Sequence, residues 1–211
     1  MWVILPVKAF RNAKLRLAAV LTAKQRARFS YLMLEDLLEA LHTSPDVDGI
    51  TVISSDQSVQ ALTQRYQVEL LLTNVDSGYS QDATQAINAL QQQDIATVAI
   101  IPADVPYLSH ADLSRLNLLH DKGLTLCPAV IDGGTNGLLF SPPLRIPLMF
   151  GNDSLNKYLS AAQENNLATK IAQIAGLERD IDRPEDLLWL KNQVSGGQAW
   201  SYIREQEFIK N

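Results

Sequence analysis

The chain has 211 residues, 46% of them hydrophobic, and a formal net charge of -5. A chain of this length and composition can bury one substantial core, which excludes a disordered protein and a disulfide-stapled miniprotein. The acidic balance argues against nucleic acid as a partner, because proteins that bind a phosphate backbone usually carry a basic face. The single cysteine, Cys127, cannot form an intrachain disulfide, which is typical of the reducing cytoplasm.

The chain is expected to form one domain away from any membrane. No apolar run reaches the roughly 18 residues that a membrane-spanning helix needs. Residues 1–8 are apolar but short and lack a basic leader, so they predict a first strand and not a signal peptide. Residues 1–194 are expected to be the domain and 195–211 a polar and aromatic tail beyond Ser195-Gly-Gly197. Such a tail can pack back on the domain or against a partner, including a second copy in a homodimer.

Short β-branched runs alternate with longer helical patterns between residues 2 and 190, which predicts an α/β fold with a mostly parallel sheet flanked by helices. The runs are apolar throughout, as expected of strands that are buried on both faces. In such a sheet, functional residues are sought at the carboxyl ends of the strands. The predicted strands are Val3 to Val7, Ile50 to Ile53, Val68 to Leu72 and Thr97 to Ile101.

The first long helix is predicted to begin after Thr22. Thr22 and Gln25 have the spacing of a capping box, and apolar residues recur at helical spacing from Phe29 to Leu41. Pro45 is expected to lie beyond its end. The segment 123–147 is rich in Gly and Pro, so strands and loops are predicted there, late in the sheet. Further helices are predicted over 83–90, 113–119 and 153–163.

A group of cations follows the first strand, at Lys8, Arg11, Lys14 and Arg16. This local positive charge in an acidic chain suits a polyphosphate, because Arg grips phosphate oxygens bidentately and Lys acts as a mobile point charge. The segment does not end in the Gly-Lys-Ser/Thr of a P-loop, so a P-loop NTPase is not supported. A solvated basic turn before a helix explains the same charges equally well.

Carboxylates occur after the fourth strand, at Asp104, and again at Asp180 and Asp182. A carboxylate at such a position can hold a hard cation such as Mg²⁺, although a side-chain turn is the simpler explanation of Asp104 alone. Asp182 stands three residues before Glu185, which is the spacing of a helix N-cap with its capping box. Asp180 has no such role, and both residues face the same side of an extended segment. Two carboxylates ~4 Å apart repel by about 4 kcal/mol, so a shared cation would be needed between them.

The last cluster combines glycines with hydroxyl groups, in Gly133 to Gly137 and in Pro147 to Ser154. Glycine lets a backbone approach a ligand closely, and Thr135 and Ser154 offer hydroxyl donors. Ser154 also precedes a helical pattern, and helix N-termini bind anions. A hairpin turn at the glycines and an ordinary helix cap at Ser154 or the residue before it are the structural alternatives.

Taken in order, these motifs resemble the 2-phospho-L-lactate guanylyltransferases of deazaflavin coenzyme (F-420) biosynthesis, a family that also contains phosphoenolpyruvate and 3-phosphoglycerate guanylyltransferases. The resemblance runs from Pro6 to about Leu188. It implies a sheet like that of nucleotide-diphospho-sugar transferases (GT-A-like), GTP as the donor and Mg²⁺ as the cofactor. Its carriers are Pro6-Val-Lys8, Ala13 to Leu17, Asp104-Val-Pro106, Gly134-Thr-Asn136, Leu138 to Pro142, Phe150-Gly151 with Ser154, Asp180-Ile-Asp182, and Pro184 to Leu187.

The resemblance also implies roles for single residues. Asp104 and Asp182, aided by Asp180, would hold Mg²⁺. Catalysis would come from positioning and charge neutralisation at Lys14, Arg16 and Asp104, without a general base, because a phosphate nucleophile is already an anion. The nucleotide contacts would be Pro6, Lys8, Lys14, Arg16, Asp56 and Ser80. The acceptor contacts would be Thr135, Gly151 and Ser154.

The implied reaction transfers GMP from GTP to the phosphate of a small phosphorylated hydroxy or enol acid and releases pyrophosphate. The chain departs from the family where a Gly-Leu-Asn-Ala-like stretch is replaced by Gly78-Tyr-Ser-Gln-Asp-Ala83, a segment expected near the base. One alternative is a nucleotidyltransferase of the same fold with another acceptor, such as molybdopterin, but those enzymes have a Gly-rich first loop. The other is a catalytically silent nucleotide-binding module, against which Lys14, Asp104 and Asp182 argue.

Overall fold

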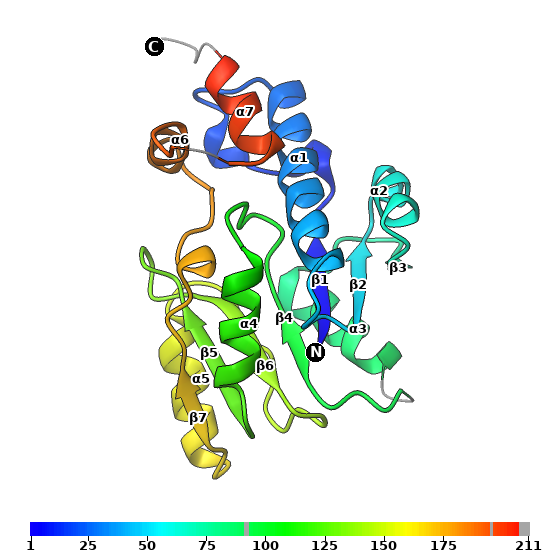
Figure 1. The fold of residues 1–211 in the computed structure, drawn as a ribbon, viewed down its shortest axis with the longest axis vertical. Helices are drawn as coiled ribbons and strands as arrows, with labels where there is room; N and C mark the ends of the chain where they lie inside the picture. Colours follow the sequence, from blue (N-terminus) through cyan, green and yellow to red (C-terminus); the bar gives the residue numbers. More distant parts are fainter. Residues whose placement is uncertain (91–92, 195, 207–211) are drawn as a thin grey trace.

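The computed structural model of this protein describes residues 1–90, 93–194 and 196–206. Its strands are β1 (Trp2–Val7), β2 (Gly49–Ser54), β3 (Glu69–Leu72), β4 (Val98–Ile100), β5 (Leu124–Pro128), β6 (Thr135–Phe140) and β7 (Thr169–Ile171). They form a seven-stranded sheet in the order β3-β2-β1-β4-β6-β5-β7 (Figure 1). The predicted α/β fold is confirmed, and β1 to β4 match the predicted strands to within a residue or two at each end.

Most strand pairs are parallel, and the exception matters for the site. β1 pairs in parallel with β2 and β4, and β5 with β7. β6 runs antiparallel to both β4 and β5. Because of this reversal, the beginning of β6 lies at the same edge of the sheet as the carboxyl ends of β1 and β4. β7 was not predicted, because its short sequence Thr-Lys-Ile lies exposed at the sheet edge and carries no apolar run.

The helices are α1 (Ala23–His42), α2 (Gln60–Arg65), α3 (Tyr79–Leu90), α4 (His110–Leu119), α5 (Ser154–Glu164), α6 (Pro184–Lys191) and α7 (Gln198–Glu205). The predicted capping box is confirmed at α1, where the Gln25 N–H donates to Thr22 Oγ1 and the Thr22 N–H donates to Gln25 Oε1. α1 ends before Pro45, as expected. α3 and α4 begin a few residues earlier than predicted, because their first turns carry polar residues that lack the apolar pattern.

Helices cover both faces of the sheet. α1, α2 and α4 pack on the face that carries Val3 and Leu5 of β1. α3 and α5 pack on the other face, against Ile4 of β1, Ile100 of β4 and Leu138 of β6. Alternate residues of one strand thus enter two different cores, which explains why β1 is apolar along its whole length.

A third core lies beyond the sheet, at the end of the molecule toward which β2 points (Figure 1). It joins Leu17, the first half of α1, α6 and α7. α7 is fixed to α1 because the Asp36 carboxylate accepts the backbone N–H groups of Gln198 and Ala199 at 2.8 Å each. Of the predicted tail, Ser195 and residues 207–211, with Phe208, lie outside the described residues. No helix within the described ranges is long and apolar enough to cross a bilayer.

Candidate active site

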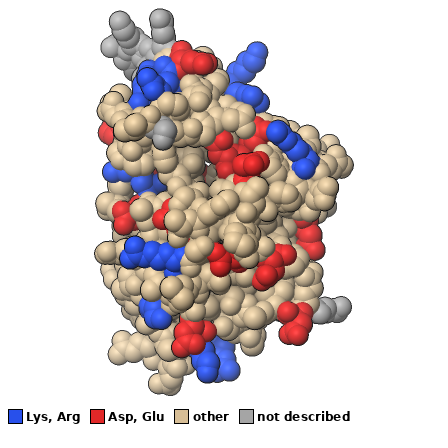
Figure 2. All heavy atoms as spheres, in the orientation of Figure 1, with Lys and Arg blue, Asp and Glu red and all other residues tan. Residues whose placement is uncertain are grey.

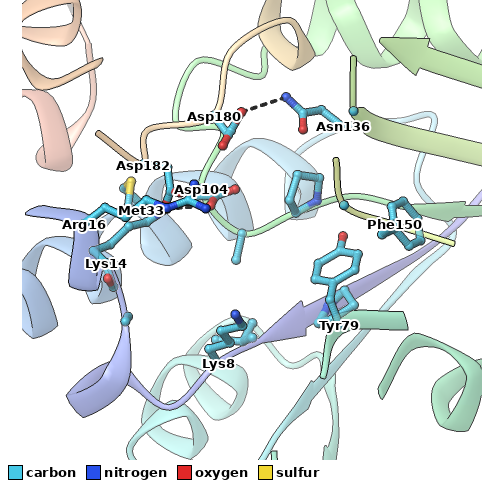
Figure 3. Close-up of a pocket in the computed structure, with 18 of the residues that line it drawn as sticks. Lys8, Lys14, Arg16, Met33, Tyr79, Asp104, Asn136, Phe150, Asp180 and Asp182 are labelled. Carbon is cyan, nitrogen blue, oxygen red and sulfur yellow. Dashed lines mark hydrogen bonds and ion pairs between the residues drawn. The ribbon is translucent and has the colours of Figure 1, made fainter. Parts of the chain in front are cut away.

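The main cavity of interest lies where β1 and β4 end and β6 begins. The sheet register pairs Ile4 with Ile100 and Ile100 with Leu138, so the residues that follow β1 and β4 meet those that open β6. The cavity has a volume of about 470 Å³. Its wall is formed by residues of the loop after β1, among them Lys8, Lys14 and Arg16, together with Ser30 and Met33 of α1, Tyr79, Pro102 to Asp104, Asp132, Gly134 to Asn136, Phe150-Gly151, and Asp180 with Asp182 (Figure 3).

The loop after β1 brings Lys14 into this cavity. Two short 3-10 turns flank the residue, and its own backbone is left-handed, with φ 55° and ψ 41°. That conformation is uncommon outside glycine and is typical of functional sites. The loop is fixed behind Lys14 by Phe10. The Phe10 side chain is buried, and its backbone N–H donates to Asp56 Oδ2 at 2.8 Å. As a result the Lys14 side chain is only 7% exposed although it carries a charge.

Lys14 and Arg16 are already paired with carboxylates. Lys14 Nζ lies 2.5 Å from Asp104 Oδ2 and 3.5 Å from Asp182 Oδ1. Arg16 Nη1 lies 2.6 Å from Asp182 Oδ2 at the exposed rim. Burial lowers the pKa of Lys14, but the negative charges of the surrounding carboxylates outweigh burial and raise the pKa above its usual value. The ammonium therefore stays charged, and we call Lys14, Arg16, Asp104 and Asp182 the charged end of the cavity.

The segment 180–182 is held beside Asp104 by the backbone. The Ile181 N–H donates to the Asp104 carbonyl oxygen at 3.0 Å, and the Ile181 side chain is fully buried. The structural alternative, in which Asp182 caps the following helix, is not the arrangement found. Arg183 occupies the N-cap position of α6, and Asp186 accepts the N–H groups of Asp182 and Arg183. The Asp182 carboxylate is therefore available to the cavity.

The Asp180 carboxylate is partly buried and lies close enough to Asp104 to be repelled by its charge. Burial first, and then repulsion by the Asp104 carboxylate, raise the pKa of Asp180 above its usual value. Asn136 opposes this by donating from Nδ2 to Asp180 Oδ1 at 3.3 Å. Asp104 Oδ1 is buried and lacks a hydrogen-bond partner within the described part of the chain. There, no group of three or more His, Cys, Asp or Glu side chains is assembled closely enough to hold a metal ion.

Another part of the cavity wall is built from neutral hydroxyl groups and a glycine. Ser154 Oγ donates to Thr135 Oγ1 at 3.1 Å, and both residues are buried. Thr135 lines the cavity, while Ser154 lies behind it at the start of α5. Gly151, with φ +116°, adopts a conformation that favours glycine and exposes its backbone to the same space.

Two aromatic residues that the sequence analysis did not select complete this side. Tyr79, the first residue of α3, and Phe150 both line the cavity and contact each other edge to face. Aromatic residues at helix starts and in loops are usually core residues, so composition gave no signal for them. The segment 78–83, where the chain departs from the family pattern, opens α3 beside the cavity, and there Tyr79 lines the wall whereas the predicted nucleotide contact Ser80 does not. We call Tyr79, Thr135, Gly151 and Ser154 the hydroxyl end of the cavity.

The structure brings together most of the predicted site residues. Asp56, Ser80 and Ser154 are not part of the cavity wall. Asp56 supports the loop after β1 from behind, and Ser80 Oγ accepts the Phe150 N–H at 3.2 Å. The functional roles of all these residues stay predictions. The predicted site residues that do line the cavity are Pro6, Lys8, Lys14, Arg16, Asp104, Thr135, Gly151, Asp180 and Asp182.

Figure 2 shows the distribution of charge on one face of the molecule. Lys and Arg side chains are interspersed there with Asp and Glu, and the blue atoms do not merge into one continuous area. This mixture of both signs is expected of a chain with 18 Lys and Arg and 23 Asp and Glu residues.

Comparison with known proteins gives both a family and a fold. The family model described as "Guanylyl transferase CofC like" matches residues 1–210. A phosphoenolpyruvate guanylyltransferase from Roseiflexus sp. is 37% identical, covering 95% of this chain and 89% of the relative. A 2-phospho-L-lactate guanylyltransferase from Methanothermobacter thermautotrophicus is 28% identical, covering 97% of this chain and 90% of the relative.

Among solved structures, a putative nucleotide-diphospho-sugar transferase from Desulfovibrio desulfuricans G20 superposes with a TM-score of 0.77. The match covers 97% of this chain and 94% of that one, at 16% sequence identity. At that identity the likeness shows the fold alone, and the fold is the one that the order of motifs implied.

Proposed function

The chain belongs to the family of CofC-like guanylyl transferases, and from that premise we propose that it transfers GMP from GTP to the phosphate of a small phosphorylated hydroxy or enol acid. The acceptors to consider are 2-phospho-L-lactate, phosphoenolpyruvate and 3-phosphoglycerate. The names of the relatives include all three acceptors. The product is an acid joined to guanosine through a diphosphate, and we place this reaction in the cytoplasmic synthesis of a deazaflavin coenzyme.

The observation that carries this proposal is the presence of two unlike ends in one cavity. The charged end offers cations from the loop after β1, next to the carboxylates that follow β4 and precede α6. The hydroxyl end offers neutral donors and a glycine backbone. A polyphosphate fits the first end and a small anion fits the second, so both substrates can meet at the sheet edge where β1 and β4 end.

In the proposed complex, Lys8, Lys14 and Arg16 bind the triphosphate of GTP. Lys8 is exposed on the cavity wall, whereas Lys14 and Arg16 pair with carboxylates. Phosphate oxygens would replace those carboxylates as partners of the two cations. The cations then neutralise charge on the triphosphate and hold its α-phosphorus near the acceptor.

The bond changes follow from the positions of the substrates. An oxygen of the acceptor phosphate attacks the α-phosphorus of GTP and forms a new P–O bond. The bond from the α-phosphorus to the oxygen that bridges it to the β-phosphate breaks, and pyrophosphate leaves with that electron pair. Because the attacking oxygen is already anionic at neutral pH, no side chain has to remove a proton. Lys14 and Arg16 stabilise the charge that develops on the leaving group.

We further propose that Mg²⁺ binds at the charged end, held by Asp104 and Asp182 with Asp180 as a third carboxylate. Carboxylate oxygens are the ligands that a hard cation prefers, and Asp104 Oδ1 is buried without a partner among the described residues. Because no three of these side chains are assembled closely enough there to hold a metal ion, the proposal requires the carboxylates to draw together around Mg²⁺. The ammonium of Lys14 lies among the same carboxylates, where a cation is favoured. A bound Mg²⁺ supplies Lewis-acid stabilisation of phosphate charge.

The direct test is pyrophosphate release from GTP with each of the three acceptors, with and without Mg²⁺. We expect release with at least one acceptor, loss of release on addition of EDTA, and weaker release when ATP or CTP replaces GTP. Binding of Mg²⁺ with a non-reactive α,β-methylene analogue of GTP, followed by the rise in Tm, checks the metal independently of turnover. Absence of pyrophosphate with all three acceptors would contradict the proposal.

A further inference from the structure

A tyrosine hydroxyl in the cavity wall has no role in the reaction as described above. Tyr79 lines the cavity, and its hydroxyl oxygen is buried without a hydrogen-bond partner in the described part of the chain. Buried hydroxyl groups nearly always find a partner, because an unpaired one loses its bond to water without replacement. A ligand bound in the cavity would supply the missing hydrogen-bond partner of the Tyr79 hydroxyl.

The ring of Tyr79 is fixed against the acceptor side of the cavity. It contacts the Phe150 ring edge to face at a centroid distance of 4.8 Å, and Phe150 contacts Tyr158 in the same way at 5.7 Å. The Phe150 N–H donates to Ser80 Oγ, so the start of α3 is bonded to the segment that leads into Gly151. Tyr79 is therefore part of the same packed unit as the predicted acceptor contact Gly151.

The hydroxyl group of Tyr79 is suited to donate to an anion. Figure 3 shows it directed into the space between Asn136 and Phe150, away from Lys8. Burial, followed by the negative charge of Asp104, raises the pKa of Tyr79 well above its usual value. The phenol consequently keeps its proton at working pH. A neutral donor there can bind an anion without the desolvation cost of a second buried cation.

Two groups of substrate atoms could reach this hydroxyl, those of GTP and those of the acceptor. The contacts of Tyr79 favour the acceptor, because they are made with Phe150, next to Gly151, and not with the cations of the loop after β1. The acceptor is therefore the substrate that the Tyr79 hydroxyl would contact, from the side of α3.

We propose that Tyr79 is a specificity-determining residue whose hydroxyl donates a hydrogen bond to the anionic acceptor acid. This inference rests on the proposed guanylyltransferase function. The acceptor contacts implied by the resemblance are Thr135, Gly151 and Ser154, so Tyr79 would be a further hydrogen-bond donor to the acceptor, from α3.

The test is Tyr79→Phe, which keeps the ring and its contact with Phe150 and removes only the hydroxyl. A hydrogen bond to a charged group predicts a rise in the acceptor KM of about tenfold, with the GTP KM unchanged. Calorimetric titration of the acceptor into enzyme that holds the α,β-methylene analogue of GTP and Mg²⁺ should show the same loss of affinity. Tyr202→Phe is the matched control, because it removes a phenol hydroxyl from a groove between α1 and α7.

Each outcome decides the question. An unchanged acceptor KM in Tyr79→Phe, or a rise in the GTP KM instead, overturns the inference while the wild-type enzyme remains an active guanylyltransferase. A wild type that releases no pyrophosphate overturns the proposed function itself, and the inference with it. Tyr79→Leu removes the ring together with the hydroxyl, so comparison with Tyr79→Phe separates the contributions of the two groups. If Tyr79→Leu raises the acceptor KM but Tyr79→Phe does not, the ring and not the hydroxyl is responsible, which also overturns the inference.

Discussion

The two ends of the cavity use opposite ways of preparing for a ligand. At the charged end, Lys14 and Arg16 are ionised and already paired with Asp104 and Asp182, so a substrate binds by exchanging partners. At the hydroxyl end, the donors are neutral, and Tyr79 in particular is buried without a partner. The difference implies that the charged end supplies most of the catalytic effect, because charge neutralisation is worth more than a neutral hydrogen bond. The hydroxyl end supplies selection among acceptors.

The largest effect is expected from removing the central carboxylate of the charged end. Asp104→Asn keeps the shape of the side chain but removes its charge, so the closest ionic partner of Lys14 and a proposed Mg²⁺ ligand are lost together. We expect kcat to fall by about 10³-fold or more, on the scale seen when preorganised electrostatic groups are deleted. Steady-state kinetics measures the loss, and circular dichroism should show an intact fold.

Asp132→Asn is the matched control for this variant. Asp132 also lines the cavity, but its carboxylate accepts the Gly134 N–H at 2.8 Å, a bond that asparagine can keep through its own oxygen. We expect this variant to retain most of the activity. Equal inactivation of both variants would show that any carboxylate in the wall is needed, and the distinction between the two ends would then fail.

An intermediate effect is expected at the rim of the charged end. Arg16 is 66% exposed, and its bond to Asp182 is a surface ion pair, which contributes little to stability. Arg16→Ala should therefore leave Tm nearly unchanged and raise the GTP KM by about tenfold, as expected for a lost charge-assisted contact to phosphate. The acceptor KM should not change.

Arg11→Ala removes the same charge from the same loop and provides the control. Arg11 is exposed and is not part of the cavity wall. If both variants raised the GTP KM equally, the loop would attract GTP only through its overall charge, and no local contact from Arg16 would be required. A larger effect at Arg16 supports a direct phosphate contact.

Sequence reasoning found the charged end more completely than the hydroxyl end, and the reason is physical. Lys14 and Asp104 are charged residues in the loops that follow apolar strands, and Asp182 is a charged residue just before α6, positions that core packing does not explain. Tyr79 and Phe150 are the kinds of residue that cores use, so only their tertiary positions distinguish them. The cap of α6 was wrong by one residue because Glu185 and Asp186 both suit a capping box, and the backbone selects between them.

The same contrast holds for the sheet. β1 and β2 are recognisable because both of their faces are buried, which leaves a continuous apolar run. β7 is exposed throughout and gives no such signal. The reversal of β6 brings Thr135 to the edge where β1 ends, and it depends on pairing with β4 and β5, which no local pattern encodes. The sequence signal for the turn was the pair Gly133-Gly134, offered as a hairpin, and in the structure Gly133 has φ +66° in the connection from β5.

The smallest effect is expected behind the hydroxyl end, at Ser154. Ser154 is fully buried and does not line the cavity, so it acts through the bond from its Oγ to Thr135 Oγ1. Ser154→Ala should lower stability by about 1 kcal/mol, the usual value of one hydrogen bond, and raise the acceptor KM about threefold through a less well-fixed Thr135. Thr135→Ala should raise the acceptor KM further, and the double variant should be no worse than Thr135→Ala alone. Additive effects would instead mean that Ser154 contacts the acceptor directly, and the hydroxyl end would then hold one more binding group than its geometry indicates.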